Sequence, residues 1–119
     1  MKKLFYILSV AFICISCDPP YDDYYFIDND CEETISVTAI VHERKRLNFS
    51  VAGKTKYMFH LETDIFSNFS GEYVFTTMEI MKKDVTSQTN FLVKEKWEFV
   101  KLDKRVAEWH LTVRPEDFE

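Results

Sequence analysis

Apolar and polar residues alternate with a period of two along most of the chain after residue 23. The alternation is clearest over 34–42, where Ile35, Val37, Ala39 and Val41 fall on one face. A period of two is typical of a β-strand with one buried face. Seven ranges are therefore predicted to form strands: 24–27, 34–42, 46–51, 55–62, 72–81, 91–101 and 105–113.

The predicted connections are short, and no long segment has the 3.6-residue period of a helix. Between the third and fourth strands, Ala52-Gly53-Lys54 predicts a hairpin in which Gly53 takes a positive φ. Residues 63–71 are predicted to form a loop, and residues 82–90 a polar turn. About seven short strands predict an antiparallel β-sandwich of immunoglobulin-like or transthyretin-like character. A small lipocalin-like meander barrel is the alternative.

The last two predicted strands indicate how one hairpin buries its aromatic residues. A turn centred on Asp103 places Trp97 opposite Trp109. The same register places Phe99 opposite Ala107, so that one face is apolar and the other is charged. A slip by one residue would exchange the faces, and burial should fix the register. We therefore expect both tryptophans in the core.

The first 16 residues follow a different pattern. Lys2 and Lys3 precede the apolar run 4–15, which only Ser9 interrupts. A membrane-spanning helix needs about 20 apolar residues. The run is too short for that purpose and has the length of the h-region of a signal peptide.

Ser16 and Cys17 follow this run directly. The segment resembles a bacterial lipobox, with Cys14 standing where the lipobox usually has Leu. The resemblance implies cleavage between Ser16 and Cys17 and a diacylglycerol (palmitate-type) lipid on Cys17, which would anchor the chain in a membrane. The alternative is an ordinary secretory signal cut near Ser16 or Asp18.

The remainder of the chain has the length of one domain. We expect a signal peptide over 1–16, an acidic Pro-containing tether over 17–23 and a β-sandwich over 24–119. Aromatic residues make up 16% of the chain, which is enough to build a core. The Lys-, Phe-, Tyr- and Ile-rich composition and the acidic tether resemble those of a small envelope lipoprotein of the Bacteroidetes type.

Charge is unevenly distributed along the chain. Residues 17–33 contain seven acidic residues and no Lys or Arg, whereas residues 34–119 contain 13 of each sign. On this count, the whole excess of acid lies next to the expected anchor. An acidic segment repels nucleic acid, and no basic stripe is present to bind it. We expect no nucleic-acid partner.

Few residues suggest chemistry. His42, His60 and His110 lack metal-ligand spacing. Residues 28–33 could offer oxygens to Ca²⁺, but they lack the glycine of a calcium loop and are interpreted as a solvated acidic turn. Their carboxylates would also raise the pKa of the Cys31 thiol, so Cys31 is interpreted as a small buried hydrophobe. No catalytic residue, metal site or cofactor is predicted, and we expect no enzyme activity.

Phe66 and Phe69 lie in the predicted loop 63–71, which carries few charges. Exposed, they would form an apolar patch for a partner, whereas buried they would plug one end of the sandwich. The function that these observations favour is a lipid-anchored envelope accessory or protein-interaction module. A small-ligand or glycan-binding surface lipoprotein and an immunity or inhibitor lipoprotein are the alternatives. We expect the outer membrane, with its periplasmic and surface faces both open.

Overall fold

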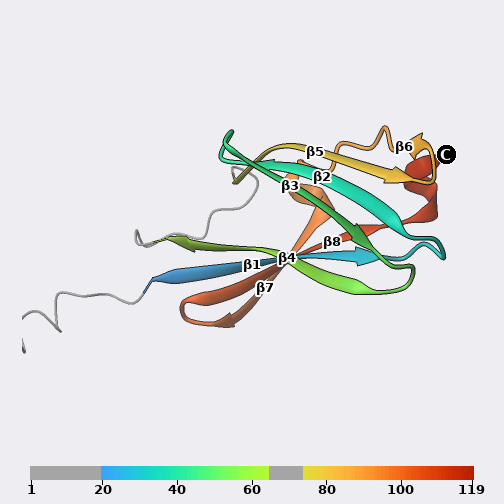
Figure 1. Cartoon of the computed structure of the whole chain (residues 1–119). Coiled ribbons are helices and arrows are strands. Elements are labelled where there is room, and N and C mark those ends of the chain that lie inside the picture. Colours follow the sequence, from blue (N-terminus) through green and yellow to red (C-terminus); the bar gives the residue numbers. More distant parts are fainter. Residues whose placement is uncertain (1–19, 65–73) are drawn as a thin grey trace, which may run out of the picture.

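The computed structural model describes residues 20–64 and 74–119, which form two packed four-stranded β-sheets (Figure 1). Sheet A has the strand order β4-β1-β8-β7, and sheet B has the order β3-β2-β5-β6. The strands are β1 (Tyr21–Asn29), β2 (Ile35–Val41), β3 (Lys45–Val51), β4 (Lys56–Asp64), β5 (Phe75–Lys82), β6 (Val85–Thr86), β7 (Trp97–Asp103) and β8 (Val106–Val113). Two short 3₁₀ helices, η2 (Lys94–Lys96) and η3 (Pro115–Phe118), complete the described elements.

The predicted β-sandwich is confirmed, and the barrel alternative is wrong because the described strands form two separate sheets. Alternation of side chains explains this packing. Every second residue of β2 is buried, and β8 follows the same pattern. The first and last strands, β1 and β8, pair in parallel at the centre of sheet A. β1 is therefore hydrogen-bonded along both of its edges, to β4 on one side and to β8 on the other.

β1 begins earlier than the sequence pattern indicates. Tyr21, Asp22 and Asp23, which the sequence assigns to the tether, pair with the end of β4. Asp23 is fully buried although it is an acidic residue, and its Oδ1 accepts a hydrogen bond of 2.9 Å from the indole Nε1–H of Trp109. The pattern of apolar alternation does not reveal the start of β1, because the inner-face position there is occupied by an aspartate.

The hairpin predicted at residues 52–54 is wrong. β3 lies in sheet B and β4 in sheet A, so the connection crosses from one sheet to the other. Gly53 does not have a positive φ, whereas Lys54 does, with φ of 58°. Glycine is needed at position 53 for a different reason, since a Cβ there would lie 1.9 Å from the carbonyl oxygen of Glu32. Only the absence of a side chain allows this close approach.

The predicted register of the last hairpin is also wrong, although the two faces are assigned correctly. Trp97 pairs with Leu111, and Phe99 pairs with Trp109. The turn lies at 104–105, where the Asp103 carboxylate accepts a 2.6 Å hydrogen bond from the Lys104 N–H. A bulge inserts one residue between Lys101 and Asp103. Because the hairpin is displaced by two residues, parity is kept and each side chain stays on its expected face.

The first half of the predicted strand 91–101 is not a strand. Residues 91–93 form a turn that leads into η2, and β7 begins only at Trp97. Phe91 is nevertheless buried, and its carbonyl accepts a 2.7 Å hydrogen bond from the Trp97 indole. Phe91 therefore contributes its side chain to the core from a loop and not from a strand.

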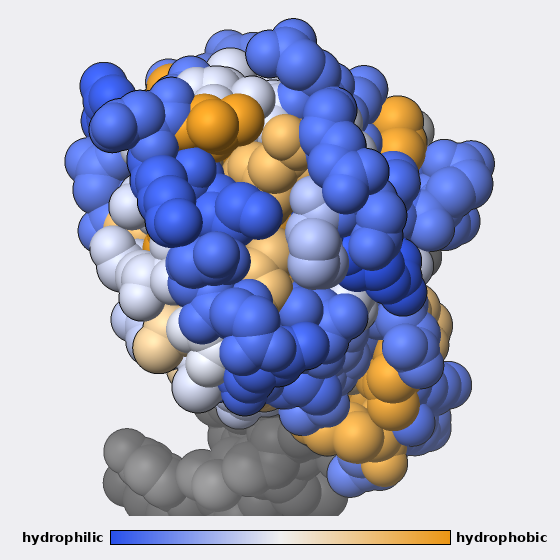
Figure 2. Space-filling model, turned by 90° about the vertical axis from the view of Figure 1, so that its right-hand side faces the viewer, coloured by the Kyte–Doolittle hydropathy of each residue, from blue (hydrophilic) through white to orange (hydrophobic). Residues whose placement is uncertain are grey.

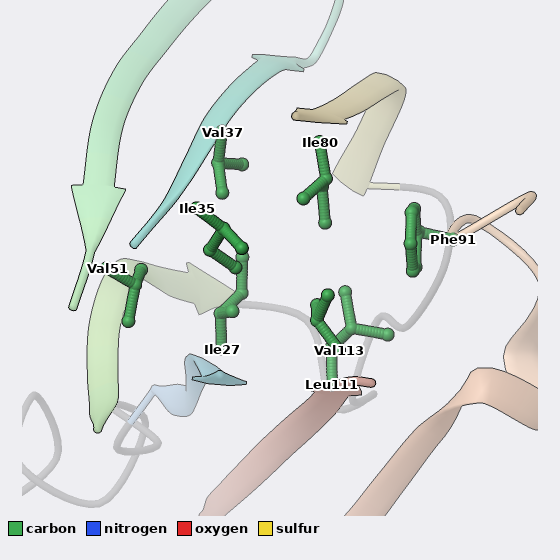
Figure 3. Packing of buried hydrophobic residues seen from close by; sticks show 8 residues of the cluster. All are labelled: Ile27, Ile35, Val37, Val51, Ile80, Phe91, Leu111 and Val113. Atoms are coloured by element: carbon green, nitrogen blue, oxygen red, sulfur yellow. The ribbon is translucent and has the colours of Figure 1, made fainter. Parts of the chain in front are cut away.

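The core has two parts. At the end of the sandwich that holds the C-terminus, which we call the C-terminal end, aliphatic side chains of both sheets point toward one another around Phe91 (Figure 3). At the opposite end, where β1 begins and which we call the N-terminal end, the core is aromatic. It consists of Tyr25, Ala39, Val41, Val74, Phe75 and Trp109. Trp97 packs against both parts and Trp109 is buried, which confirms the prediction that both tryptophans belong to the core.

Candidate functional site

The residues that the sequence singles out as sites lie outside the described residues. These are Ser16 and Cys17 at the expected cleavage site, and Phe66 and Phe69 in the loop after β4. Asp64 and Val74, the described residues that border that loop, both lie at the N-terminal end of the sandwich. Residues 20–64 and 74–119 contain no helix with the length and apolarity that a membrane crossing requires.

An exposed apolar row follows β4, an edge strand of sheet A. The side chains of Met58 and Leu61 are 42% and 44% exposed, and we call these two residues the β4 row. Tyr57 is also exposed, but it pairs with the buried Ile27 and lies on the other face of the strand, beside Phe49. Met58 pairs with Phe26 and Leu61 with Tyr24, so both point to the outer face of the sheet. Among the described strands, β4 pairs with β1 alone, which leaves its other backbone edge open.

A β-bulge makes this row possible. The pairing of β1 with β4 shifts between Tyr25 and Phe26, and Phe59 is the extra residue. In a regular strand, Met58 and Leu61 would point to opposite faces, because they are three positions apart. The bulge brings both to the outer face and turns Phe59 toward the core, where it stacks on Phe49 at 5.1 Å. Sequence analysis missed the row because a bulge leaves no period-two signal.

Half-buried aromatic residues extend the β4 row across the outer face of sheet A. Phe26 stacks on His110 with ring centroids 4.8 Å apart, and His110 Nε2 lies 2.9 Å from Glu108 Oε1. Asp22 and Asp28 lie on the same face as Phe26, because side chains alternate along β1. The apolar band is therefore framed by carboxylates.

A second cluster joins the two sheets at the N-terminal end. Glu62, on β4, has its Oε1 2.6 Å from Nε2 of His42 and its Oε2 2.7 Å from Nε2 of His60. His42 lies in the turn after β2, so one carboxylate connects sheet B with sheet A. Burial opposes ionisation of Glu62, but the hydrogen bonds from His60 and His42 outweigh it and lower the pKa of the carboxyl group.

This cluster borders an open surface hollow, which Arg44 and Lys45 also line. Both Nε2 atoms of the histidines are already directed at Glu62, and the described residues contain no group of three or more side chains suited to a metal ion. The remaining histidine, His110, lies on β8 beside Glu108. The arrangement can link the two sheets, and its charge responds to pH.

Cys31 is fully buried, which confirms its interpretation as a small hydrophobe. Burial, followed by nearby carboxylates, raises the pKa of its thiol, although Lys82 acts in the opposite direction. A raised thiol pKa disfavours the nucleophilic thiolate. The acidic turn around Cys31 is solvated as predicted, since Asp30 and Glu32 are exposed, whereas the uncharged Asn29 is fully buried there.

Comparisons with protein-family models, with curated proteins and with solved structures found no match to this chain. Its function must therefore be argued from its own residues.

Proposed function

We propose that this chain is a lipid-anchored accessory protein of the bacterial envelope that binds a protein partner through the β4 row. The N-terminal pattern supports the anchor, since Lys2 and Lys3, the apolar run 4–15 and the Ser16-Cys17 pair match a lipoprotein signal. The single observation that carries the binding role is the β4 row, a set of exposed apolar side chains on an open edge strand.

An open edge with apolar side chains favours recognition by strand addition. The unpaired N–H and C=O groups of an edge strand can bond to an extended segment of another chain, and alternate side chains then read its sequence. Edge strands are usually protected by charges. The stretch of β4 from Met58 to Leu61 carries no such charge, because Lys56 lies before it and Glu62 after it. The row is therefore suited to contact.

Charge defines the partner more closely. Asp22 and Asp28 lie on the outer face near the β4 row, and Glu108 lies on the same face. A segment that alternates apolar residues with Lys or Arg would bury the row and place its cations beside these carboxylates. The partner that we propose is thus an extended, basic and apolar segment of another envelope protein.

The small-ligand and glycan alternative has less support. Ligand sites are usually concave and enclose most of the ligand. The hollow beside His42 is open to solvent, and the carboxylate of Glu62 within it is already bonded to two histidines. An immunity or inhibitor protein would also bind a protein, so only the identity of the partner separates that alternative from our proposal.

Site-specific photo-crosslinking in intact cells of the source organism tests the proposal. A photoreactive residue replaces Met58 on the β4 row, and the control carries it at Glu79, an exposed position of β5 in sheet B. We expect position 58 alone to give a protein adduct, with the crosslink mapped to an extended segment rich in Lys or Arg. The substitution Leu61→Asp should abolish the adduct without lowering the melting temperature, because Leu61 is 44% exposed.

Three outcomes would contradict the proposed binding role. They are equal crosslinking from positions 58 and 79, an adduct with a second copy of this chain, and an adduct with lipid or glycan only. An adduct that survives Leu61→Asp would show that the β4 row is not the contact surface.

A further inference from the structure

The proposed anchor fixes which end of the sandwich faces the membrane, and the inference below rests on that proposal. Cys17 and Tyr21, the first residue of β1, are separated by four residue steps. An extended chain covers at most about 3.6 Å per residue, so the lipid-bearing residue stays within about 14 Å of the strand. The N-terminal end of the sandwich must therefore lie close to the lipid headgroups.

Two hairpin turns lie at this end, the β7–β8 turn beside the start of β1 and the β2–β3 turn in the other sheet (Figure 1). The β7–β8 turn is adjacent, since the Asp22 N–H donates to the Arg105 carbonyl at 2.8 Å. The β2–β3 turn is held there by the contact of His42 with Glu62. The two turns and their flanks carry six basic residues: Arg44, Lys45, Arg46, Lys101, Lys104 and Arg105. All of them are exposed except Arg105, which is half-buried over the Tyr21 ring.

The carboxylates at this end are mostly held by the protein itself. Asp23 is buried against Trp109, and Glu62 lies between its two histidines. Asp22 accepts a hydrogen bond of 3.1 Å from the Thr63 hydroxyl. Residues 42–46 and 101–105 contain two acids, Glu43 and Asp103, against the six bases, which gives these two segments a net charge of +4. Asp22, Asp23 and Glu62 at the same end partly offset this charge.

The acidic residues at 28–33 lie at the opposite end, where Lys54 Nζ lies 3.1 Å from Asp30 Oδ1 and Lys83 Nζ lies 3.8 Å from Glu33 Oε1. At about 3.3 Å per residue, β1 carries Asp28 about 23 Å from Tyr21. The view onto the C-terminal end is mainly hydrophilic, with smaller hydrophobic areas (Figure 2). The acids at 28–33 are thus not next to the proposed anchor, whereas Asp22 and Asp23 stay at the N-terminal end. Distance along the sequence does not measure distance from the membrane when the intervening segment is a strand.

Leu102 provides a second observation at the N-terminal end. It is 57% exposed, more than any other large hydrophobic residue described. It is the extra residue of the bulge between Lys101 and Asp103, close to the tip of the β7–β8 hairpin. An exposed leucine flanked by Lys101 and Lys104 is typical of a segment that lies in the interfacial layer of a membrane.

We infer that the β2–β3 and β7–β8 turns form a second membrane contact, in which their Lys and Arg side chains bind anionic phospholipid headgroups and Leu102 enters the interface. Basic residues near an anionic surface each add to the attraction, which falls off within a Debye length of about 8 Å. The contact would orient the sandwich with its strands pointing away from the membrane. The β4 row would then run outward, accessible along its length to the proposed partner.

Fluorescence of the reconstituted, lipid-bearing protein tests this inference. An environment-sensitive fluorophore is attached at Leu102→Cys, and the matched control carries it at Glu116→Cys, which is exposed at the C-terminal end. Cys31 is buried and should not react with the label. The protein is placed in phosphatidylcholine vesicles with or without phosphatidylglycerol, and nitroxide-bearing lipids serve as quenchers.

We expect quenching and a blue shift at position 102 in the anionic vesicles, and neither at position 116. In the Lys101→Gln/Lys104→Gln variant, the ratio of membrane-bound to unbound turns should fall by about tenfold or more. Each cation near the headgroups contributes about 1 kcal/mol, which corresponds to about a fivefold change in this ratio. The variant Lys54→Gln/Lys83→Gln, altered at the C-terminal end, should behave like the parent.

Unquenched emission at position 102 in a protein whose mass confirms the lipid on Cys17 would overturn the inference and leave the proposed anchor intact. Equal quenching in the neutral and anionic vesicles would overturn the role of the basic residues. A mature protein whose mass shows no lipid would overturn the proposed anchor, and with it the inference.

Discussion

The two ends of this sandwich are stabilised by different chemistry. At the C-terminal end, an aliphatic core is closed by the amide of Asn29, which lies 2.9 Å from the Glu33 carbonyl oxygen and 3.0 Å from that of Val51. At the N-terminal end, an aromatic core is bordered by ionisable groups, with Asp23 on Trp109 and Glu62 between two histidines. Amide hydrogen bonds do not titrate, whereas the hydrogen bonds of a carboxylate weaken when acid protonates it.

This difference separates the end of the domain that has a structural role from the surfaces that we propose as contacts. The C-terminal end contains the tight approach of Gly53 to the Glu32 carbonyl and the buried amide of Asn29, and neither leaves room for change. The N-terminal end contains the basic turns, and the β4 row runs from it. We expect substitutions at the two ends to lower the free energy of unfolding by different amounts and with a different dependence on pH.

Trp109→Ala should have the largest effect on the N-terminal end. Trp109 is 6% exposed, and its removal leaves a cavity and also leaves Asp23 without the indole donor. Loss of a buried tryptophan typically costs about 3–5 kcal/mol of the free energy of unfolding. Denaturant titration at neutral pH measures it. A loss below about 1 kcal/mol would contradict the assignment of Trp109 to the core, and Trp109→Phe serves as a control that keeps most of the volume.

Asn29→Ala should disrupt the C-terminal end by about 2–3 kcal/mol, because the carbonyls of Val51 and Glu33 lose a buried donor. The Cys31 N–H also loses its acceptor, Asn29 Oδ1, at 2.9 Å. The loss should be the same at pH 7 and pH 5, since no ionisable partner is involved. Thermal unfolding at both pH values checks this, and a strongly pH-dependent loss would show that the two ends are not chemically distinct.

Glu62→Gln should have the smallest effect, about 1 kcal/mol or less at neutral pH, because glutamine keeps the size of the side chain and the partner His42 is 54% exposed. The pKa of Glu62 is lowered from 4.5, so the folded protein favours the ionised form. Its contribution is fully present above pH 4.5 and is lost as the pH falls through the lower pKa of the folded state. Urea titrations between neutral and acidic pH should show the two curves converging on acidification, and a difference that grows would contradict the assignment.

Much of the fold could be predicted from the sequence, because alternation is local information. Ile35, Val37, Ala39 and Val41 are all buried, as their spacing indicates. The errors arise where one residue serves a non-local partner. Gly53 has the local sequence pattern of a hairpin glycine, but its actual role is set by the backbone of Glu32, which packs against it. Which sheet β4 joins depends on β1, more than 25 residues earlier.

The candidate surfaces were harder to predict for the same reason. Met58 and Leu61 share a face only because Phe59 is the extra residue of a β-bulge. Leu102 is likewise the extra residue of a bulge, and this position exposes its side chain. Neither bulge interrupts the hydrophobic pattern. The basic turns were missed because Arg44 and Lys104 lie 60 residues apart in the chain and meet at one end only after folding. Charge summed along the sequence therefore does not reveal that these basic residues gather at one end of the sandwich.

The anchor at Cys17 is the claim on which the orientation of the domain depends, and fractionation of source cells producing the wild type or Cys17→Ala tests it most directly. We predict that the wild type sediments with membranes and carries a lipid-modified Cys17 by mass spectrometry, and that Cys17→Ala is released into the soluble fraction. Retention of Cys17→Ala in the membrane fraction after a high-salt wash would contradict the account.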